Sequence, residues 1–334
     1  MTQQLEEKNL YPLLFEPIYK EVMWGGTKLA SELNRELPKT EVPIGESWEI
    51  VDRDGDISVV ENGSFKGKNL RELIETYGHD LVGEKFAHKR FPLLVKIIDA
   101  KKRLSLQVHP DKNTCKKLPS AEPKTEMWYI MSADKGAKIF AGLNHKSTMR
   151  RFMDTYQSTV VEECLQISKS VPGDAYFITS GTVHAIGAGN LLLEIQENSD
   201  TTFRISDWGR VGTDGKPREL HVEEAMQSIH FTQRTSPKIS GVIGTVTHNR
   251  KFPLVQYCQF FHIDDLRLAK NWNDNTCSSG FHILTAVNND IKVGNGDVQV
   301  EVKRGRNCLI PSAFGKYTIF VKEGTETTVI KTKI

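Results

Sequence analysis

Residues 171–186 read VPGDAYFITSGTVHAI, which is a turn glycine, a short apolar strand, a turn of small residues and a second short strand. The same order recurs at 303–319, KRGRNCLIPSAFGKYTI. Four positions match: Gly173 with Gly305, Phe177 with Leu309, Ile178 with Ile310, and Ser180 with Ser312. Short strands and turns in this order are typical of jelly-roll units. The sequence therefore predicts a mainly β protein with two related jelly-roll barrels and a few short helices.

The repeat also predicts a difference between its two copies. In this register His184 meets Lys316, and a protonated lysine cannot bind a metal ion. If the second unit is a duplicate of the first, we expect it to have lost any metal site that the first unit carries.

The rest of the chain is mostly short β-like runs separated by Gly, Asn and Asp. Helical periodicity is confined to three segments, which are 68–86, 144–156 and 221–231. The stretch 232–249, rich in Ser, Thr, Pro and Gly, is the predicted linker. We therefore expect a catalytic domain at 1–235 and a C-terminal β domain at 236–334.

The bulk composition excludes several classes of protein. Lys plus Arg is 44 and Asp plus Glu is 42, so a net charge of +2 predicts no nucleic-acid or membrane partner. The N-terminus lacks a basic stretch followed by an apolar one, so we expect a cytoplasmic protein. Five scattered cysteines form no CxxC pair, which argues against a thiolate zinc site. A monomer or a small homo-oligomer agrees equally well with this composition.

One predicted strand has an unusual polar face. In LSLQVHPDK (104–112) apolar and polar residues alternate, and the polar positions are Ser105, Gln107 and His109. Two further segments carry charged or metal-ligating residues in the same way. EPKTEMWYIM (122–131) places Lys124, Glu126 and Trp128 on one face of a strand, and the region from His184 onward adds Glu194 and Arg204. In a barrel such a face can point inward, where a charge without a partner or a metal is costly.

Two imidazoles and one carboxylate are a common set of ligands for Zn²⁺, Fe²⁺ or Mn²⁺. His109, His184 and Glu126 supply these groups, and Gln107 on the same face as His109 can add an oxygen. The alternative is a polar barrel face that lines a pocket without a metal, because no tight HxxxH or HxH motif anchors the pattern.

Basic residues accompany the proposed ligands; they are Lys96, Lys112, Lys124 and Arg204. In a chain of nearly neutral charge, such a group suits an anionic substrate such as a phosphate ester. The alternative is a set of ordinary surface charges, which we favour for Lys112.

Together these segments resemble the type I mannose-6-phosphate isomerases, and most of all their short bacterial form. The resemblance rests on LSLQVHPDK, EPKTEMWYI, the stretch from PGDAYFITSG to ISDWGR, and the earlier VMWGGTKL and PIGESWEI, and it covers about Pro12 to Phe231. It implies a cupin-like fold and one Zn²⁺ per chain. It also implies interconversion of mannose 6-phosphate and fructose 6-phosphate through an enediol.

Carried over by motif position, the resemblance implies zinc ligands at Gln107, His109, Glu126 and His184. It makes Arg204 catalytic, with Lys124 and Glu194 as substrate-contacting or proton-transfer residues, and it places Ser105 and Lys96 along the sugar-phosphate cleft. Larger members of the family insert a helical domain between the Glu ligand and the second His ligand. Only 57 residues separate Glu126 from His184 here, enough for at most one or two short helices.

Two other functions agree with the same residues. One is another cupin metalloenzyme of the non-haem iron type, since two histidines and a carboxylate also bind iron. The other is a cupin that binds a sugar phosphate without catalysis. The presence of Lys124, Glu126, Glu194 and Arg204 together favours the isomerase, because a binding protein has no need of a proton-transfer set.

Overall fold

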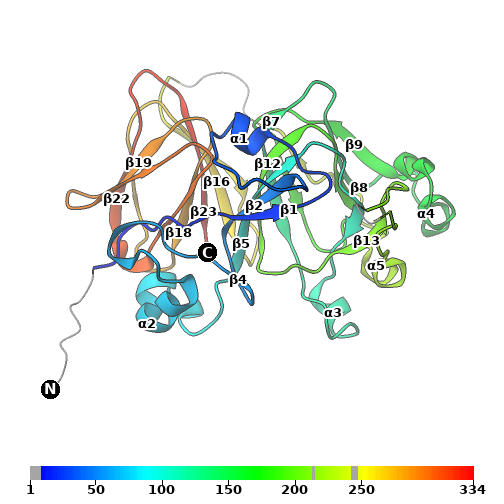
Figure 1. Cartoon of the computed structure of the whole chain (residues 1–334), viewed down its shortest axis with the longest axis horizontal. Coiled ribbons are helices and arrows are strands. Elements are labelled where there is room, and N and C mark those ends of the chain that lie inside the picture. Colours follow the sequence, from blue (N-terminus) through cyan, green and yellow to red (C-terminus); the bar gives the residue numbers. More distant parts are fainter. Residues whose placement is uncertain (1–8, 213–214, 242–246) are drawn as a thin grey trace. The chain divides into compact units, whose positions relative to one another are not determined.

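The computed structural model describes residues 9–212, 215–241 and 247–334. The chain divides into two compact units. The first unit comprises 1–18, 49–92 and 244–334, and the second comprises 19–48 and 93–243. None of the helices in the described ranges is both long and apolar enough to cross a membrane. Figure 1 shows far more strand than helix in both units, so the prediction of a mainly β protein is confirmed.

The second unit contains two antiparallel sheets. The larger has the order β1 (Ile18–Glu21), β2 (Ile44–Ile50), β5 (Leu93–Ala100), β12 (Asn190–Glu197), β7 (Glu126–Ala133), β10 (Ala175–Ile178) and β14 (Lys238–Ile239). The smaller has the order β13 (Phe203–Ser206), β6 (Leu106–Val108), β11 (His184–Ile186), β8 (Lys138–Leu143) and β9 (Leu165–Lys169). One hydrophobic cluster joins Trp128 and Ile178 of the larger sheet to Ile139 and Ile186 of the smaller, so the sheets pack face to face.

Helices cover the outer face of the smaller sheet. They are α4 (Met149–Thr155), the 3₁₀ segment η3 (Thr159–Cys164) and α5 (Val222–Ser228), and α4 and α5 are visible beside β8 and β13 in Figure 1. Leu106 and Val108 of β6 pack with Phe152 of α4 and Ala225 of α5 in one buried cluster. Because the apolar side chains of β6 face these helices, its polar side chains face the interior of the barrel.

The first unit repeats this arrangement. Its sheets have the orders β15 (Arg250–Val255), β16 (His262–Leu268), β23 (Thr327–Lys333), β18 (His282–Ala286), β21 (Asn307–Ile310), and β17 (Trp272–Asn275), β22 (Lys316–Phe320), β19 (Ile291–Gly294), β20 (Gln299–Val302). The orders β16-β23-β18-β21 and β17-β22-β19-β20 match β5-β12-β7-β10 and β6-β11-β8-β9 of the second unit. The predicted duplication of the jelly roll is therefore confirmed.

The remaining elements are short. They are α1 (Lys28–Ser31), β3 (Asp52–Arg53), β4 (Asp56–Ile57), η1 (Gly63–Phe65), α2 (Leu70–Val82), η2 (Glu84–Phe86), α3 (Lys112–Cys115) and η4 (Ser312–Phe314). Each of the three segments with helical periodicity contains a helix, namely α2, α4 and α5. Between Glu126 and His184 the helical elements are α4 and η3, as expected for a chain without a helical insertion.

The register of the repeat holds in its first half and fails in its second. Gly173 and Gly305 both have positive φ, and β10 and β21 begin two residues later. After the turn, however, the inward residue of β22 is Tyr317, whereas Lys316 is exposed. His184 therefore corresponds to Tyr317 rather than to Lys316. The prediction of Lys316 was wrong by one residue, because one residue more in the turn moves every following side chain to the other face.

The structural counterparts of the candidate metal ligands form a closed polar cluster. Strand pairing identifies these counterparts. His184 lies opposite Gln107 in its ladder, and Tyr317 lies opposite Asp274 in the equivalent one, so Asp274 corresponds to Gln107. In the same way Glu126 lies opposite Ile178 and His282 lies opposite Ile310, so His282 corresponds to Glu126. His282 Nδ1 lies 2.7 Å from the Tyr317 hydroxyl, and Lys331 Nζ lies 2.5 Å from Asp274 Oδ2. The ammonium of Lys331 thus supplies a positive charge from within the chain.

The units of the structure differ from a simple division of the sequence into 1–235 and 236–334. Residues 49–92 lie far from 244–334 in the sequence but share a unit with them, and an ion pair of 2.8 Å joins Glu61 to Arg306. Part of the predicted linker forms β14, which pairs with β10, while 242–246 lies outside the described residues. The division into a catalytic domain at 1–235 and a C-terminal domain at 236–334 stays a prediction.

Replacing Lys331 with methionine should destabilise the protein. The change keeps the apolar stem but leaves the half-buried Asp274 carboxylate without its cation, and breaking such a pair costs about 3 kcal/mol of unfolding free energy. Lys303→Met is the matched control, because the Lys303–Asp290 pair is exposed and should change stability little. Urea unfolding measures both variants, and equal effects would contradict the assignment.

His282 should make the stability sensitive to acid. Burial and the charge of Lys331 lower its pKa to about 4, below the value of about 6.5 expected for the unfolded chain. Its contribution is therefore complete above about pH 6.5 and is lost as the pH falls toward 4. The unfolding free energy of His282→Gln should fall less between pH 7 and pH 4.5 than that of the wild type, and parallel losses would refute this.

Candidate metal centre and cavity

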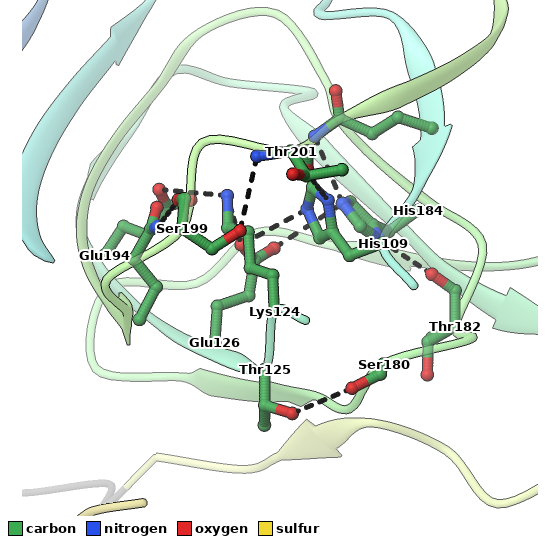
Figure 2. A network of polar contacts seen from close by, with 12 residues as sticks. His109, Lys124, Thr125, Glu126, Ser180, Thr182, His184, Glu194, Ser199 and Thr201 are labelled. Atoms are coloured by element: carbon green, nitrogen blue, oxygen red, sulfur yellow. Dashed lines mark hydrogen bonds and ion pairs between the residues drawn. The ribbon is translucent and has the colours of Figure 1, made fainter. Parts of the chain in front are cut away.

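The three candidate ligands converge in the interior of the second unit (Figure 2). Glu126 opens β7, His184 opens β11, and His109 directly follows β6. His109 Nε2 lies 3.4 Å from Glu126 Oε2, and His184 Nε2 lies 3.5 Å from Glu126 Oε1. All three side chains are at most 1% exposed. The structure therefore brings together two imidazole nitrogens and a carboxylate within reach of a single cation.

Backbone carbonyls orient both imidazoles. His109 Nδ1 lies 2.8 Å from the carbonyl oxygen of Thr201, and His184 Nδ1 lies 2.8 Å from that of Thr182. A carbonyl oxygen can only accept, so each Nδ1 carries the hydrogen and each Nε2 offers a lone pair to the centre. Among the described residues, His109 Nε2 and Glu126 Oε1 have no hydrogen-bond partner. Buried acceptors of this kind fit a bound cation.

The charge states suit metal binding. Burial, together with the charge of Lys124, lowers the pKa of His109 to about 4, and burial also lowers the pKa of His184. Burial alone would raise the pKa of Glu126, but the charge of Lys124 holds it well below its usual range. Neutral imidazoles and an ionised carboxylate are the forms that bind a divalent metal.

Gln107 adjoins the cluster on the same inward face. Its Nε2 lies 3.1 Å from His184 Nε2, and its Oε1 lies 3.3 Å from the Ser105 hydroxyl. Rotating the carboxamide by 180° exchanges these two atoms without moving any others, and it places an oxygen beside the imidazole nitrogen. The predicted fourth ligand is therefore positioned to contribute an oxygen.

A cavity of about 320 Å³ lies next to this cluster. Six residues singled out in the sequence line it, namely Lys96, Ser105, Gln107, Lys124, Glu194 and Arg204. Gln107 and Lys124 link the cavity to the cluster, because Lys124 Nζ lies 2.9 Å from Glu126 Oε2. Lys112 begins α3 and is not part of this lining, in agreement with the preference for a surface charge.

Glu194 connects several of these residues. Its Oε1 lies 3.3 Å from Lys96 Nζ and 3.9 Å from Lys124 Nζ, and its Oε2 accepts a hydrogen bond of 2.8 Å from the indole of Trp128. Burial alone would lower the pKa of Lys96, but the carboxylates of Glu46 and Glu194 raise it above its usual value. Lys96 is therefore a fixed positive charge in the wall of the cavity.

Arg204 lies opposite Gln107 in the ladder between β13 and β6. One guanidinium nitrogen donates to the carbonyl of Glu219 at 2.7 Å, and burial lowers the pKa of Arg204 without bringing it near neutrality. Arg218 lines the same cavity and bonds to Asp207 through Nε at 2.9 Å. Lys96, Lys124, Arg204 and Arg218 thus give the cavity four cationic side chains.

Sequence reasoning missed several lining residues, including Trp24, Glu46, Asp200 and Arg218. Trp24 and Glu46 lie within the quoted segments VMWGGTKL and PIGESWEI, so those motifs carried a signal to which no role was given. No spacing pattern distinguishes Asp200 or Arg218 from ordinary surface residues.

The fold and the site define a class of protein: a cupin-like jelly roll with a buried His/Glu/His group that can hold a metal beside a cavity lined by four cationic and three acidic side chains. A family model described as "Phosphomannose isomerase type I, catalytic domain" matches residues 13–156. The chain belongs to the type I phosphomannose isomerases, a family of aldose-ketose isomerases.

Individual relatives support membership of this family. The chain is 33% identical to the probable mannose-6-phosphate isomerase GmuF of Bacillus subtilis (strain 168) over 320 residues, which cover 94% of this chain and 97% of that protein. It is 34% identical to the mannose-6-phosphate isomerase ManA of the same organism, covering 92% and 95%. The crystal structure of a Bacillus subtilis mannose 6-phosphate isomerase superposes with a TM-score of 0.85 at 30% identity, covering 97% of this chain and all of that one.

Removing one buried ligand should abolish metal binding. We expect Glu126→Gln to weaken the affinity for Zn²⁺ by at least about 100-fold, because a neutral amide replaces the single carboxylate of the cluster. His230→Gln is the control, since His230 pairs with Asp111 at 3.2 Å outside the cluster. Equilibrium dialysis after chelation and readdition of Zn²⁺ measures both. Unchanged affinity in Glu126→Gln would exclude this cluster as the site.

Proposed function

We propose that this isomerase depends on Zn²⁺ and interconverts mannose 6-phosphate and fructose 6-phosphate by moving a proton between C2 and C1. The observation that carries the proposal is the convergence of His109, Glu126 and His184 beside a cavity with four cationic side chains. The names of the relatives support the same substrate pair.

We assign the metal to His109, Glu126, His184 and the side-chain oxygen of Gln107. Nitrogen and oxygen donors of this kind suit Zn²⁺. Bound there, the ion would supply Lewis-acid positive charge to the oxygens of the substrate. The corresponding position in the first unit contains the Lys331–Asp274 pair, which supports one metal ion per chain.

The cationic residues of the cavity suit the phosphate and the charge of the reaction. Proton removal at C2 develops negative charge on the adjacent oxygen, and a positioned donor that keeps its proton stabilises that charge. Arg204 fits this role, because guanidinium remains protonated. Lys96 and Ser105 line the same cavity, where they can hold the sugar phosphate.

Two residues remain as carriers of the proton. Lys124 is engaged with the Glu126 carboxylate at 2.9 Å, whereas Glu194 presents an oxygen, Oε1, that has no hydrogen bond within the described part of the chain. We therefore assign proton transfer to Glu194, and to Lys124 the balance of charge beside Glu126.

A coupled assay for fructose 6-phosphate tests the function. The purified protein should lose isomerase activity after chelation and regain it with Zn²⁺ in the absence of oxygen. Restoration by Fe²⁺ alone, with consumption of oxygen, would point to an iron oxygenase. Binding of mannose 6-phosphate without turnover, with Zn²⁺ supplied, would point to a sugar-phosphate-binding cupin.

The roles of Arg204 and His184 should separate in variants. We expect Arg204→Ala to retain zinc and to lose about 10²- to 10³-fold in kcat, because a donor to developing charge is removed. His184→Ala should lose the metal itself. Metal analysis and kcat are measured on both, with Arg150→Ala, an exposed arginine of α4, as the control. Full activity in Arg204→Ala would contradict its role.

A further inference from the structure

Trp128 contacts both a proposed metal ligand, His184, and a residue of the cavity, Glu194, although it does not itself line the cavity. It lies two residues after Glu126 in β7, and its side chain is completely buried. Its indole N–H donates to Glu194 Oε2 at 2.8 Å. Its ring meets the ring of His184 edge to face, with centroids 5.2 Å apart and an angle of 77°.

The bond between Trp128 and Glu194 crosses directly between neighbouring strands. The two residues are opposite each other in the ladder of β7 and β12, so both side chains leave the same face of the sheet at adjacent positions. Both groups are buried, and an indole N–H that loses its acceptor there carries a full desolvation penalty. The hydrogen bond therefore opposes rotation of the carboxylate.

This fixed orientation leaves the second oxygen of Glu194 available. Oε2 is occupied by the indole, whereas Oε1 has no hydrogen bond within the described part of the chain. Oε1 lies 3.3 Å from Lys96 Nζ and 3.9 Å from Lys124 Nζ, and all three residues line the cavity. The indole thus determines which oxygen of Glu194 accepts a hydrogen bond and which one lies beside the two ammonium groups of the cavity.

We propose that Trp128 is a positioning residue for the isomerisation, holding Glu194 so that Oε1 faces C1 and C2 of the substrate. This inference rests on the proposed function. In the aldose-to-ketose direction the C2–H bond breaks and an O–H bond forms at Oε1, while the C–H electron pair forms the C1–C2 double bond. The carbonyl pair at C1 moves to O1, which takes up a proton. Oε1 then returns its proton to C1 as O2 loses one and C2=O forms.

The contact between Trp128 and His184 helps to fix the orientation of the imidazole. The Thr182 carbonyl fixes the hydrogen on Nδ1, and the ring of Trp128, packed against the imidazole, limits its rotation. One rigid indole therefore relates the position of a proposed metal ligand to that of the proposed proton carrier. A change that removes only the N–H should disturb Glu194 and leave His184 in place.

Trp128→Phe tests this role, because it keeps an aromatic ring and removes the donor. We expect kcat to fall about 10- to 100-fold, the contribution of a hydrogen bond to a charged group, while KM changes less than about threefold and zinc content is unchanged. With substrate deuterated at C2, the isotope effect on kcat should be at least as large as in the wild type, since proton transfer becomes slower.

Tyr176→Phe is the matched control. Tyr176 is buried in the same cluster, and its hydroxyl lies 2.7 Å from the Ser168 hydroxyl rather than beside Glu194. It should lose stability with little change in kcat. If Trp128→Phe fails to fold, 3-benzothienylalanine at position 128 replaces the N–H by sulfur at nearly constant shape.

The outcomes distinguish this role from the function on which it rests. A wild type that fails to isomerise mannose 6-phosphate with Zn²⁺ supplied removes the proposed function and this role with it. An active wild type whose kcat is matched by the Trp128 variants overturns the positioning role alone. A loss of activity that follows a loss of zinc overturns it as well, because Trp128 would then act through His184.

Discussion

The buried carboxylate of Glu126 is the constraint on which the rest of the site depends. It is inaccessible to water, and its neighbours are two neutral imidazoles and one ammonium. An ionised carboxylate in such a place is costly unless positive charge surrounds it. Lys124 supplies part of that charge, and a cation held between the two Nε2 lone pairs would supply the rest. The hydrogen bonds of His109 and His184 to the carbonyls of Thr201 and Thr182 fix the tautomers of both imidazoles, so that each Nε2 faces Glu126. The order of the strands brings the three side chains together.

The barrel can have a polar interior because the apolar side chains of β6 point outward and its polar side chains point inward. The apolar side chains of β6 lie under α4 and α5, so Gln107 can point into the barrel without taking hydrophobic contacts from the core. If only one face of this sheet were covered, either the apolar or the polar side chains of β6 would be exposed to solvent. The short helices α4 and α5 are thus part of what keeps the polar face inside.

The sequence predicted the jelly-roll class and singled out His109, Glu126 and His184, which the structure brings together, because alternation along a strand is local information. It could not place 49–92 in the same unit as 244–334, since nothing in the pattern of either segment encodes their pairing. It also failed at Lys316, where one extra residue in a turn reversed the face of β22. Trp128 was assigned to the polar face, but its bond to Glu194 depends on the register between β7 and β12. Registers between distant strands follow from packing of the whole barrel.

The Lys331 ammonium shows what distinguishes the two jelly rolls. Where the second unit offers ligands to an ion taken from solution, the first carries its cation on a side chain, against Asp274. That cation cannot dissociate or be exchanged, and no chelator can remove it. The first unit therefore needs no ion from its surroundings at this position, whereas a metal bound to the cluster of the second unit would stabilise it by an amount that grows with the logarithm of the free ion concentration. A scarcity of metal would then withdraw stability from the second unit and take none from the Lys331–Asp274 pair of the first.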